Sequence, residues 1–290
     1  MKFRTEIKLP EYPFRITYDD RILFLGSCFS DNIGRFFEEN GFKVSVNPFG
    51  TLFNPISIAF ALKLAMNPSL FEERFIVNND GLWHSIAHHG RFSNENRQIL
   101  TDSIKEHLTT THDFLLKTDF LFLTFGTSYV YRYKKEDFVV ANCHKIPAYE
   151  FDKERITVKT IVEEYRNLIS ELKKLNPKLK IVFTVSPVRH LGDGFHENQV
   201  SKSILHLAAD ELVGDDCFYF PSYEIFQDDL RDYRFYAQDL CHPSEAGLRY
   251  LEEKIVETFF TAETEARRKE VEKRNKAAAH RPNINYTANI

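Results

Sequence analysis

The sequence predicts an α/β protein built on one parallel, doubly wound sheet. Five short apolar segments alternate with segments of helical periodicity. One of them, Asp119 to Phe125, is apolar almost throughout, as expected of a strand covered on both faces. The sequence shows no internal repeat and no interdomain linker, so one domain accounts for the pattern. Because strand–helix–strand crossovers are right-handed, helices should cover both faces of the sheet.

The first half of the chain supplies three of the five strands. Pro10 and Pro13 disfavour a helix in residues 1–20, which we expect to be extended. The apolar run 22–25 stops at Gly26, and a helical pattern starts at Ser30. The elements expected next are a strand at 42–46, a helix at 55–67 capped by Asn54, an irregular aromatic stretch at 71–93, a helix from 94 to 115 and the strand at 119–125.

The second half begins with an excursion from the sheet. Residues 129–133 and 138–143 are strand-like and separated by four charged residues, which predicts a hairpin. The remaining elements are helices at 158–175, 198–213 and 243–260, and strands at 180–185 and 217–220. Residues 263–279 favour a helix that is polar all round and should project into solvent. The expected organisation is a domain over residues 1–262, followed by a charged helical extension and flexible tail over residues 263–290.

Composition excludes several function classes. The net charge is −4, from 38 basic and 42 acidic residues, so a nucleic-acid partner is not expected. The four cysteines are far apart and form no CxxC pair, which argues against a disulfide framework or a zinc ribbon. The N-terminal residues have no apolar signal core, and no run of 18 apolar residues occurs. We therefore expect a cytoplasmic protein with neither a membrane partner nor a cofactor.

Two short segments carry residues suited to catalysis. Ser27 and Cys28 lie side by side in the turn after the first strand, near helix amides that favour negative charge. Asp239 and His242 stand three residues apart just before the last helix of the domain. At that spacing the carboxylate can bind one imidazole nitrogen and leave the other free as a base. Along the chain the two candidate nucleophiles therefore come first and the candidate histidine base comes last.

The sequence also resembles a known family. Gly26–Ser30 resembles the motif that names the GSCFA family, with Ser30 where the name has Ala. The resemblance covers roughly residues 1–260, and the other matching segments are Asn47–Pro55, Phe125–Ser128, Asn142–Lys145, Ser186–His190, Leu230–Tyr236 and Asp239–Ser244. The family looks related to SGNH (GDSL-like) hydrolases. This resemblance implies a flavodoxin-like three-layer α/β/α sandwich with strand order 2-1-3-4-5, and it implies esterase or acyl-transfer chemistry.

The resemblance to SGNH hydrolases also implies site residues. Aligned without a gap, Cys28 takes the place of the nucleophile, and Asp239 and His242 fall on the last motif. Gly50 falls on the second motif, whose glycine amide binds the oxyanion. Gly126 and Ser128 fall on the third, where Ser128 replaces the usual Asn. Asn142 is a substitute donor, and Arg189 follows a strand end where it could clamp a carboxylate or phosphate.

The expected reaction is hydrolysis or transfer of a small acyl group from an ester, with an acylated carbohydrate as one substrate class. Of the two nucleophiles we favour Cys28, because the helix dipole and a nearby imidazolium should lower the pKa of a thiol. Ser27 remains the alternative. A structural salt bridge is the competing interpretation of Arg189.

Two other functions remain open. The first is a non-catalytic ligand-binding or interaction protein on the same scaffold, which the replacement at Ser128 favours. The second is a zinc site from Cys28, Cys143, His144 and His242, whose spacing is not diagnostic. His84, His88 and His89 form a separate group in the aromatic stretch, and for them packing or hydrogen bonding is favoured over a metal site.

Overall fold

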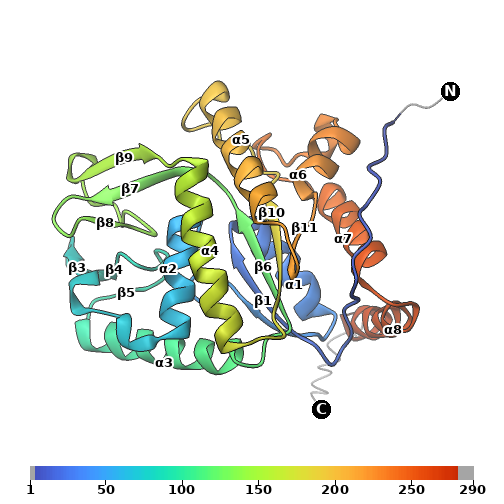
Figure 1. Ribbon diagram of the computed structural model, residues 1–290, viewed down its shortest axis with the longest axis horizontal. Helices are drawn as coiled ribbons and strands as arrows, with labels where there is room; N and C mark the ends of the chain where they lie inside the picture. Colours follow the sequence, from blue (N-terminus) through green and yellow to red (C-terminus); the bar gives the residue numbers. More distant parts are fainter. Residues whose placement is uncertain (1–3, 280–290) are drawn as a thin grey trace, which may run out of the picture.

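The centre of the protein is a five-stranded parallel sheet in the order β11-β10-β6-β1-β2 (Figure 1). The structure is a computed structural model, and it describes residues 4–279. The strands are β1 (Arg21–Gly26), β2 (Lys43–Val46), β6 (Phe120–Phe125), β10 (Lys180–Val185) and β11 (Cys217–Tyr219). Numbered among themselves, these strands have the order 2-1-3-4-5, which confirms the predicted fold.

Helices cover both faces of the sheet and complete a three-layer α/β/α sandwich. Alternate residues of β1 point to opposite faces, as the two-residue period of a strand requires. Leu23 and Leu25 belong to one core, and Ile22 and Phe24 belong to the other. The first core is closed by α2 (Pro55–Met66), α3 (Arg97–Leu115), α4 (Val158–Leu175) and α5 (Phe195–Leu212), and the second by α1 (Cys28–Glu39) and α7 (Glu245–Phe259).

Two small antiparallel sheets lie together at one side of the molecule, on the left in Figure 1. We call them the side lobe. One consists of β3 (Ile76–Asn79), β4 (Leu82–Ser85) and β5 (Ser93–Asn94), and the other of β7 (Tyr129–Tyr133), β8 (Phe138–Val139) and β9 (Phe151–Arg155). A backbone hydrogen bond from the Ala141 amide to the Ile86 carbonyl joins the two segments (2.8 Å).

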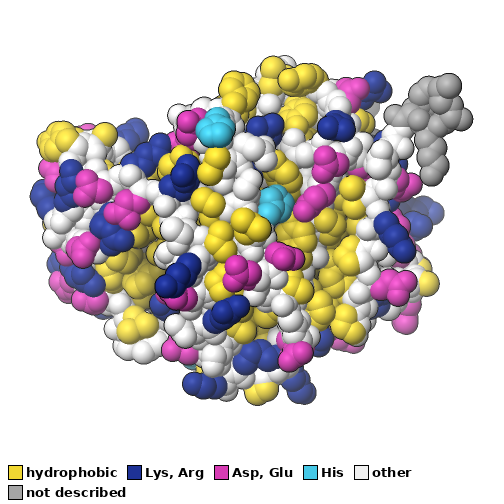
Figure 2. All heavy atoms as spheres, turned by 45° about the horizontal axis from the view of Figure 1, so that its top comes forward, with side chains coloured by type: hydrophobic (Ala, Val, Ile, Leu, Met, Phe, Trp, Pro, Cys, Tyr) yellow, Lys and Arg dark blue, Asp and Glu magenta, His cyan; other side chains and the backbone are white. Residues whose placement is uncertain are grey.

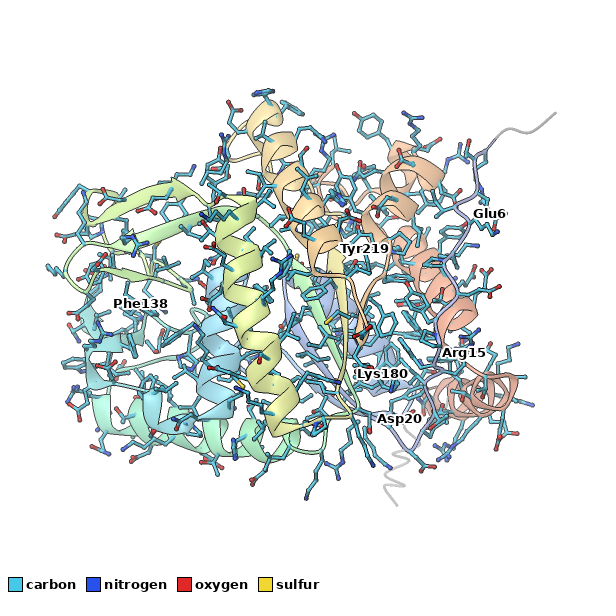
Figure 3. The ribbon with its side chains drawn as sticks, in the orientation of Figure 1. Glu6, Arg15, Asp20, Phe138, Lys180 and Tyr219 are labelled. Atoms are coloured by element: carbon cyan, nitrogen blue, oxygen red, sulfur yellow. The ribbon has the colours of Figure 1, made fainter. Side chains whose placement is uncertain are left out.

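The side lobe differs from the expectation in two respects. The hairpin after β6 was predicted, but β9 adds a third strand on the other side of β7. Its residues 152–155 are all charged and exposed, so no apolar pattern marks it. The expectation of an irregular stretch at 71–93 is wrong, because β3, β4 and β5 form there. Phe138, labelled in Figure 3, packs against Phe60 and Phe75 and fixes the lobe to α2.

The C-terminal helix α8 (Ala262–Ala279) does not simply project into solvent. The Arg267 guanidinium lies over the Tyr18 ring, 4.1 Å from its centroid, and the Thr264 hydroxyl donates to the Ile16 carbonyl. The expectation of a helix surrounded by water is therefore wrong for this face of α8. Its long basic side chains cover apolar surface through their stems, which a count of polar residues does not reveal. The tail expected beyond this helix falls on residues 280–290, outside the described residues.

The N-terminal segment runs in extended form beside α7, where Figure 3 labels Glu6 and Arg15. Its Ile16 amide donates to the Phe259 carbonyl (2.6 Å), and Glu6 receives a hydrogen bond from the buried Lys254 ammonium (2.8 Å).

The remaining elements are short helical turns. They are η1 (Pro68–Leu70), η2 (Glu73–Phe75), η3 (Ala148–Glu150), α6 (Ser222–Glu224), the π-helix η4 (Ile225–Leu230) and η5 (Tyr233–Phe235).

The surface carries mixed charge. Figure 2 shows basic and acidic side chains interspersed over the face that it presents, with no broad field of one sign. Among the helices of residues 4–279, none has both the length and the apolar character needed to cross a bilayer.

Candidate active site

The two predicted nucleophiles, Ser27 and Cys28, have different environments in the turn after β1. Gly26 has a φ of 143°, and an added Cβ there would overlap the Thr124 carbonyl, so the turn requires glycine. Ser27 is the N-cap of α1: its hydroxyl accepts from the Phe29 amide (3.3 Å), and the residue is 2% exposed. Cys28 is the first residue of the helix and is half-buried with a free thiol. Cys28 is therefore the more accessible of the two.

The thiol of Cys28 experiences opposing influences. Burial raises its pKa, and the Asp31 carboxylate one turn along α1 raises it further. The backbone amides of Cys28 and Phe29 and the Lys202 ammonium lower it, but the net pKa is above that of an ordinary thiol. The expectation of a lowered pKa is thus wrong, because desolvation outweighs the helix terminus. The charges that act most on this thiol are Asp31 and Lys202.

Lys202 is a site residue that sequence reasoning missed. It lies on α5, is 1% exposed, and donates from Nζ to the carbonyls of Gly126 (2.8 Å) and Ser186 (2.7 Å). Burial lowers the pKa of Lys202 to about 7, and Cys28 acts in the opposite direction. A signal for it does exist in the sequence, because Lys202 shares a helical face with the buried Asn198 and Leu205.

Asp239 and His242 form the expected hydrogen-bonded pair. The Asp239 Oδ2 and the His242 Nδ1 are 2.6 Å apart, and the Asp239 Oδ1 accepts from the amides of His242 (3.0 Å) and Cys241 (2.9 Å). These two amides, and then the imidazole, lower the pKa of Asp239 to about 2. Within residues 4–279 the His242 Nε2 has no hydrogen bond. The carboxylate therefore fixes the ring and leaves Nε2 available as a base.

Cys28 and His242, the candidate nucleophile and base, come from distant parts of the chain: Cys28 begins α1, and His242 precedes α7. Among the described residues no hydrogen bond joins His242 to Ser27 or Cys28. The connection between the two groups runs through other residues: the Cys241 Sγ lies 3.2 Å from the Arg189 carbonyl oxygen, and Arg189 and Cys28 both act on the charge of Lys202. A direct proton transfer from Cys28 to His242 thus needs the loop that carries His242 to move closer, or a bridging group.

Gly50, Gly126 and Ser128, which were predicted to bind the oxyanion, form hydrogen bonds with other residues of the protein. The Gly50 amide donates to the Asn47 carbonyl (2.7 Å), and the Gly126 amide donates to the Phe53 carbonyl (2.8 Å). Ser128 is fully buried, and its amide and hydroxyl both bond the Ser201 hydroxyl (2.8 and 3.1 Å). These three residues therefore have no free donor for a substrate oxygen, and their bonds hold the loops after β2 and β6 in place.

Asn142 retains a donor. Its Oδ1 accepts from the His144 amide (2.8 Å), and its Nδ2 faces the Cα of Gly90 without a hydrogen bond among the described residues. The neighbouring residue His89 packs against Gly50, where an added Cβ would overlap its side chain. Since Asp31 acts on both His89 and Cys28, this corner of the side lobe lies near the turn that carries Cys28.

Three histidines of the side lobe are bonded within the protein. The His84 Nδ1 bonds the Ser93 hydroxyl (2.6 Å), and the fully buried His88 bonds the Ser85 hydroxyl through Nδ1 (2.7 Å). The His144 Nε2 bonds the Ser85 carbonyl (2.8 Å). In the described part of the chain no three His, Cys, Asp or Glu side chains are grouped so that they could hold a metal ion. The zinc site considered from Cys28, Cys143, His144 and His242 is therefore not formed.

Comparisons with known proteins give a family and more distant structural similarities. The chain matches the GSCFA family over residues 21–255. No curated protein matches the sequence. Similar solved structures include a carbohydrate esterase family 3 protein from Talaromyces cellulolyticus, with a TM-score of 0.38 and 8% identity over 81% of this chain and 94% of that chain. Another is the acetyl xylan esterase Est2A from Butyrivibrio proteoclasticus, with a TM-score of 0.41 and 10% identity over 83% and 64% of the two chains.

Proposed function

This chain belongs to the GSCFA family, and from that premise and the geometry of its first turn we propose that it catalyses acyl transfer from a small ester through Cys28. The proposed outcome is hydrolysis, or transfer to a second hydroxyl group. The observation that carries the proposal is the contrast at the turn, where Ser27 is used as a buried cap while Cys28 stays accessible beside a buried lysine.

In the proposed reaction, His242 takes the thiol proton of Cys28, through a bridging group or after its loop moves closer, and the Cys28 sulfur attacks the ester carbonyl carbon. A carbon–sulfur bond forms, and the carbonyl π electrons move to the oxygen. When this tetrahedral intermediate collapses, the alkoxide leaves and takes a proton from His242, which leaves a thioester on Cys28. Water or an acceptor alcohol, deprotonated by His242, then attacks the thioester and restores the thiol. Asp239 orients His242 and stabilises its cation.

Lys202 supplies a positive charge close to the sulfur. The amides of Cys28 and Phe29 and the Lys202 ammonium all lower the pKa of the thiol, against burial and Asp31. When a substrate covers the site and Cys28 ionises, these groups stabilise the thiolate. For the developing oxyanion the Cys28 amide and the Asn142 Nδ2 are the donors that the proposal uses, because Gly50, Gly126 and Ser128 have partners within the protein.

A second candidate is a non-catalytic ligand-binding protein on the same scaffold. It is favoured by a specific observation: the predicted oxyanion donors Gly50 and Ser128 are satisfied internally, and no hydrogen bond links His242 to Cys28 within residues 4–279. Under this alternative the same residues would hold an ester without cleaving it.

The test is hydrolysis of p-nitrophenyl acetate and of acetylated monosaccharides by the purified protein. We expect His242→Ala to lower kcat/KM by about 100-fold or more, the usual contribution of a general base. Cys28→Ala should abolish turnover, and incubation of His242→Ala with p-nitrophenyl acetate should leave the acetyl group on Cys28, detectable by peptide mass spectrometry.

Ser27→Ala is the matched control. It removes the cap and should lower stability by about 1 kcal/mol while the acetyl group still reaches Cys28. Turnover that survives Cys28→Ala but is lost in Ser27→Ala would transfer the role to the serine. Equal rates for the wild type and His242→Ala would refute catalysis at this site and leave the binding alternative.

A further inference from the structure

Arg189 has a fixed backbone and an unpartnered side chain. The loop that follows β10 is held by three neighbouring elements: η4, α5 and the segment that carries His242. The contacts run from the Gln227 Nε2 to the Pro187 carbonyl (2.9 Å), from the Asn198 Nδ2 to the His190 carbonyl (2.8 Å), and from the Cys241 Sγ to the Arg189 carbonyl (3.2 Å). The position of the Arg189 Cα is therefore well defined.

The guanidinium, by contrast, lacks partners. Within residues 4–279 it forms no salt bridge and no hydrogen bond, and its Nε is buried without an acceptor. Arginine carries five N–H donors in a rigid fork and cannot lose its proton in a protein. A buried donor with no acceptor costs free energy that an incoming oxyanion would recover.

A second cation lies beside it. Lys202 is fully buried and uses two of its three N–H groups on the carbonyls of Gly126 and Ser186. The Arg189 loop packs on α5 on both sides of this arginine, through the Ser186 carbonyl that accepts from Lys202 and the His190 carbonyl that accepts from Asn198. Arg189 accordingly lowers the pKa of Lys202 by charge repulsion. Neither has an ion-pair partner within 4.0 Å in the described part of the chain. Two neighbouring cations without a carboxylate between them favour the binding of an anion.

The two cations connect the halves of the candidate active site. Lys202 acts on the Cys28 thiol, and the Arg189 carbonyl contacts Cys241, the residue before His242. The Arg189 loop therefore connects the segment that carries His242 with the lysine that acts on Cys28. The Lys202 ammonium lies over the Tyr223 ring, 6.0 Å from its centroid. The Tyr236 hydroxyl donates to the Gln227 Oε1 (3.2 Å), and Gln227 also bonds the Pro187 carbonyl in the Arg189 loop.

We propose that Arg189 and Lys202 form a subsite for an anionic group of the substrate, so that the ester acted on carries a carboxylate or a phosphate. The proposal rests on the function proposed above, and it names the substrate class that this site selects. Arg189 makes a bidentate contact with the two oxygens of the anion, and Lys202 adds its third N–H. Filling the subsite removes the repulsion between the two cations.

The kinetic test compares O-acetylated glucose, glucuronate and glucose 6-phosphate as substrates. We expect kcat/KM for one anionic ester to exceed that for the neutral ester by on the order of tenfold or more. Arg189→Gln should lose this preference, with kcat/KM for the anionic ester falling to that for acetylated glucose. Comparison of the acetylated glucuronate with the acetylated glucose 6-phosphate shows whether the subsite prefers a carboxylate or a phosphate. Arg35→Gln, the same change at an exposed arginine of α1, should leave the preference unchanged.

A binding measurement separates this proposal from the proposed function. Calorimetric titration with inorganic phosphate and with acetate should detect binding of at least one anion to the wild type and to Arg35→Gln, and none to Arg189→Gln. If no ester is cleaved but this pattern is found, the subsite stands and the hydrolase proposal fails. If all three esters are cleaved at equal rates, or if the preference survives in Arg189→Gln, the subsite is overturned and the hydrolase proposal remains.

Discussion

At the scale of single residues, the first turn shows how one position along a helix decides between two nucleophiles. An N-cap side chain folds back onto the amides of the first turn, whereas the next side chain points outward from the helix end. Ser27 has the first position and Cys28 the second. The sequence placed both in the turn but could not fix the first helical residue, because either could serve as the cap.

Lys202 offers a direct test of the electrostatics around Cys28. Lys202→Met removes a cation that lowers the pKa of this thiol, so the apparent pKa of Cys28 should rise. The measurement is the pH dependence of iodoacetamide alkylation, followed by mapping of the Cys28 peptide.

Lys173→Met is the matched control for this experiment. Lys173 also donates to a backbone carbonyl, that of Leu179, but it acts on Cys217 and not detectably on Cys28. Lys173→Met should therefore leave the pH dependence of Cys28 alkylation unchanged. A Cys28 profile that is the same in Lys202→Met and in the wild type would show that the lysine has no electrostatic role at the site.

At the scale of elements, the sheet was predictable and the side lobe was only partly so. Strands such as β6 are buried on both faces and leave a continuous apolar run in the sequence. β9 has one buried residue, Phe151, followed by four exposed charged ones, and it exists because β7 offers it a pairing edge. A strand that depends on a partner distant in sequence leaves no local pattern. Lys202 does lie on the buried face of a predicted helix, but its two acceptors lie on other loops, so the helical pattern alone does not assign it to the site.

The histidines of the side lobe predict sensitivity to acid. Burial lowers the pKa of His88 to about 3 and that of His144 to about 4, from an ordinary value near 6.5. Between these values and about 6.5 the unfolded chain binds more protons than the folded one, so the free energy of unfolding falls as the pH falls. The stabilisation is complete above about pH 6.5 and is lost progressively as the pH falls towards 4.

Urea unfolding at pH 7.5 and pH 5 measures this effect. His144→Gln keeps a donor for the Ser85 carbonyl and cannot titrate, so the loss of stability between the two pH values should be smaller by about 2 kcal/mol than in the wild type. His196→Gln, at an exposed histidine of α5, should behave like the wild type. An identical loss in all three proteins would exclude His144 as the source of the sensitivity.

At the scale of the whole molecule, the parallel sheet and the side lobe are assembled in different ways. The sheet follows from strand–helix alternation, and its order could be predicted from that pattern together with the family resemblance. The side lobe is made from two segments, one between α2 and α3 and the other between β6 and α4 (Figure 1). Neither segment closes a core alone, and Asn142 and His89, which border the candidate site, come from different segments. This is why the corner of the site formed by the lobe could not be derived from the sequence.

This construction has a consequence for the motions of the native protein. Few backbone hydrogen bonds join the two segments of the side lobe, and the bond from Ala141 to Ile86 is one of them. By contrast, β6 is paired along its length with β1 on one side and β10 on the other. We expect native-state hydrogen exchange to divide accordingly, with the amides of β7 and β9 exchanging through a partial opening and those of β6 only through global unfolding. Equal protection of β6 and β7 would contradict this. If the lobe opens separately, Asn142 leaves the site and returns to it without unfolding of the sheet that carries Cys28, so ligand entry and release can proceed on the timescale of the lobe alone.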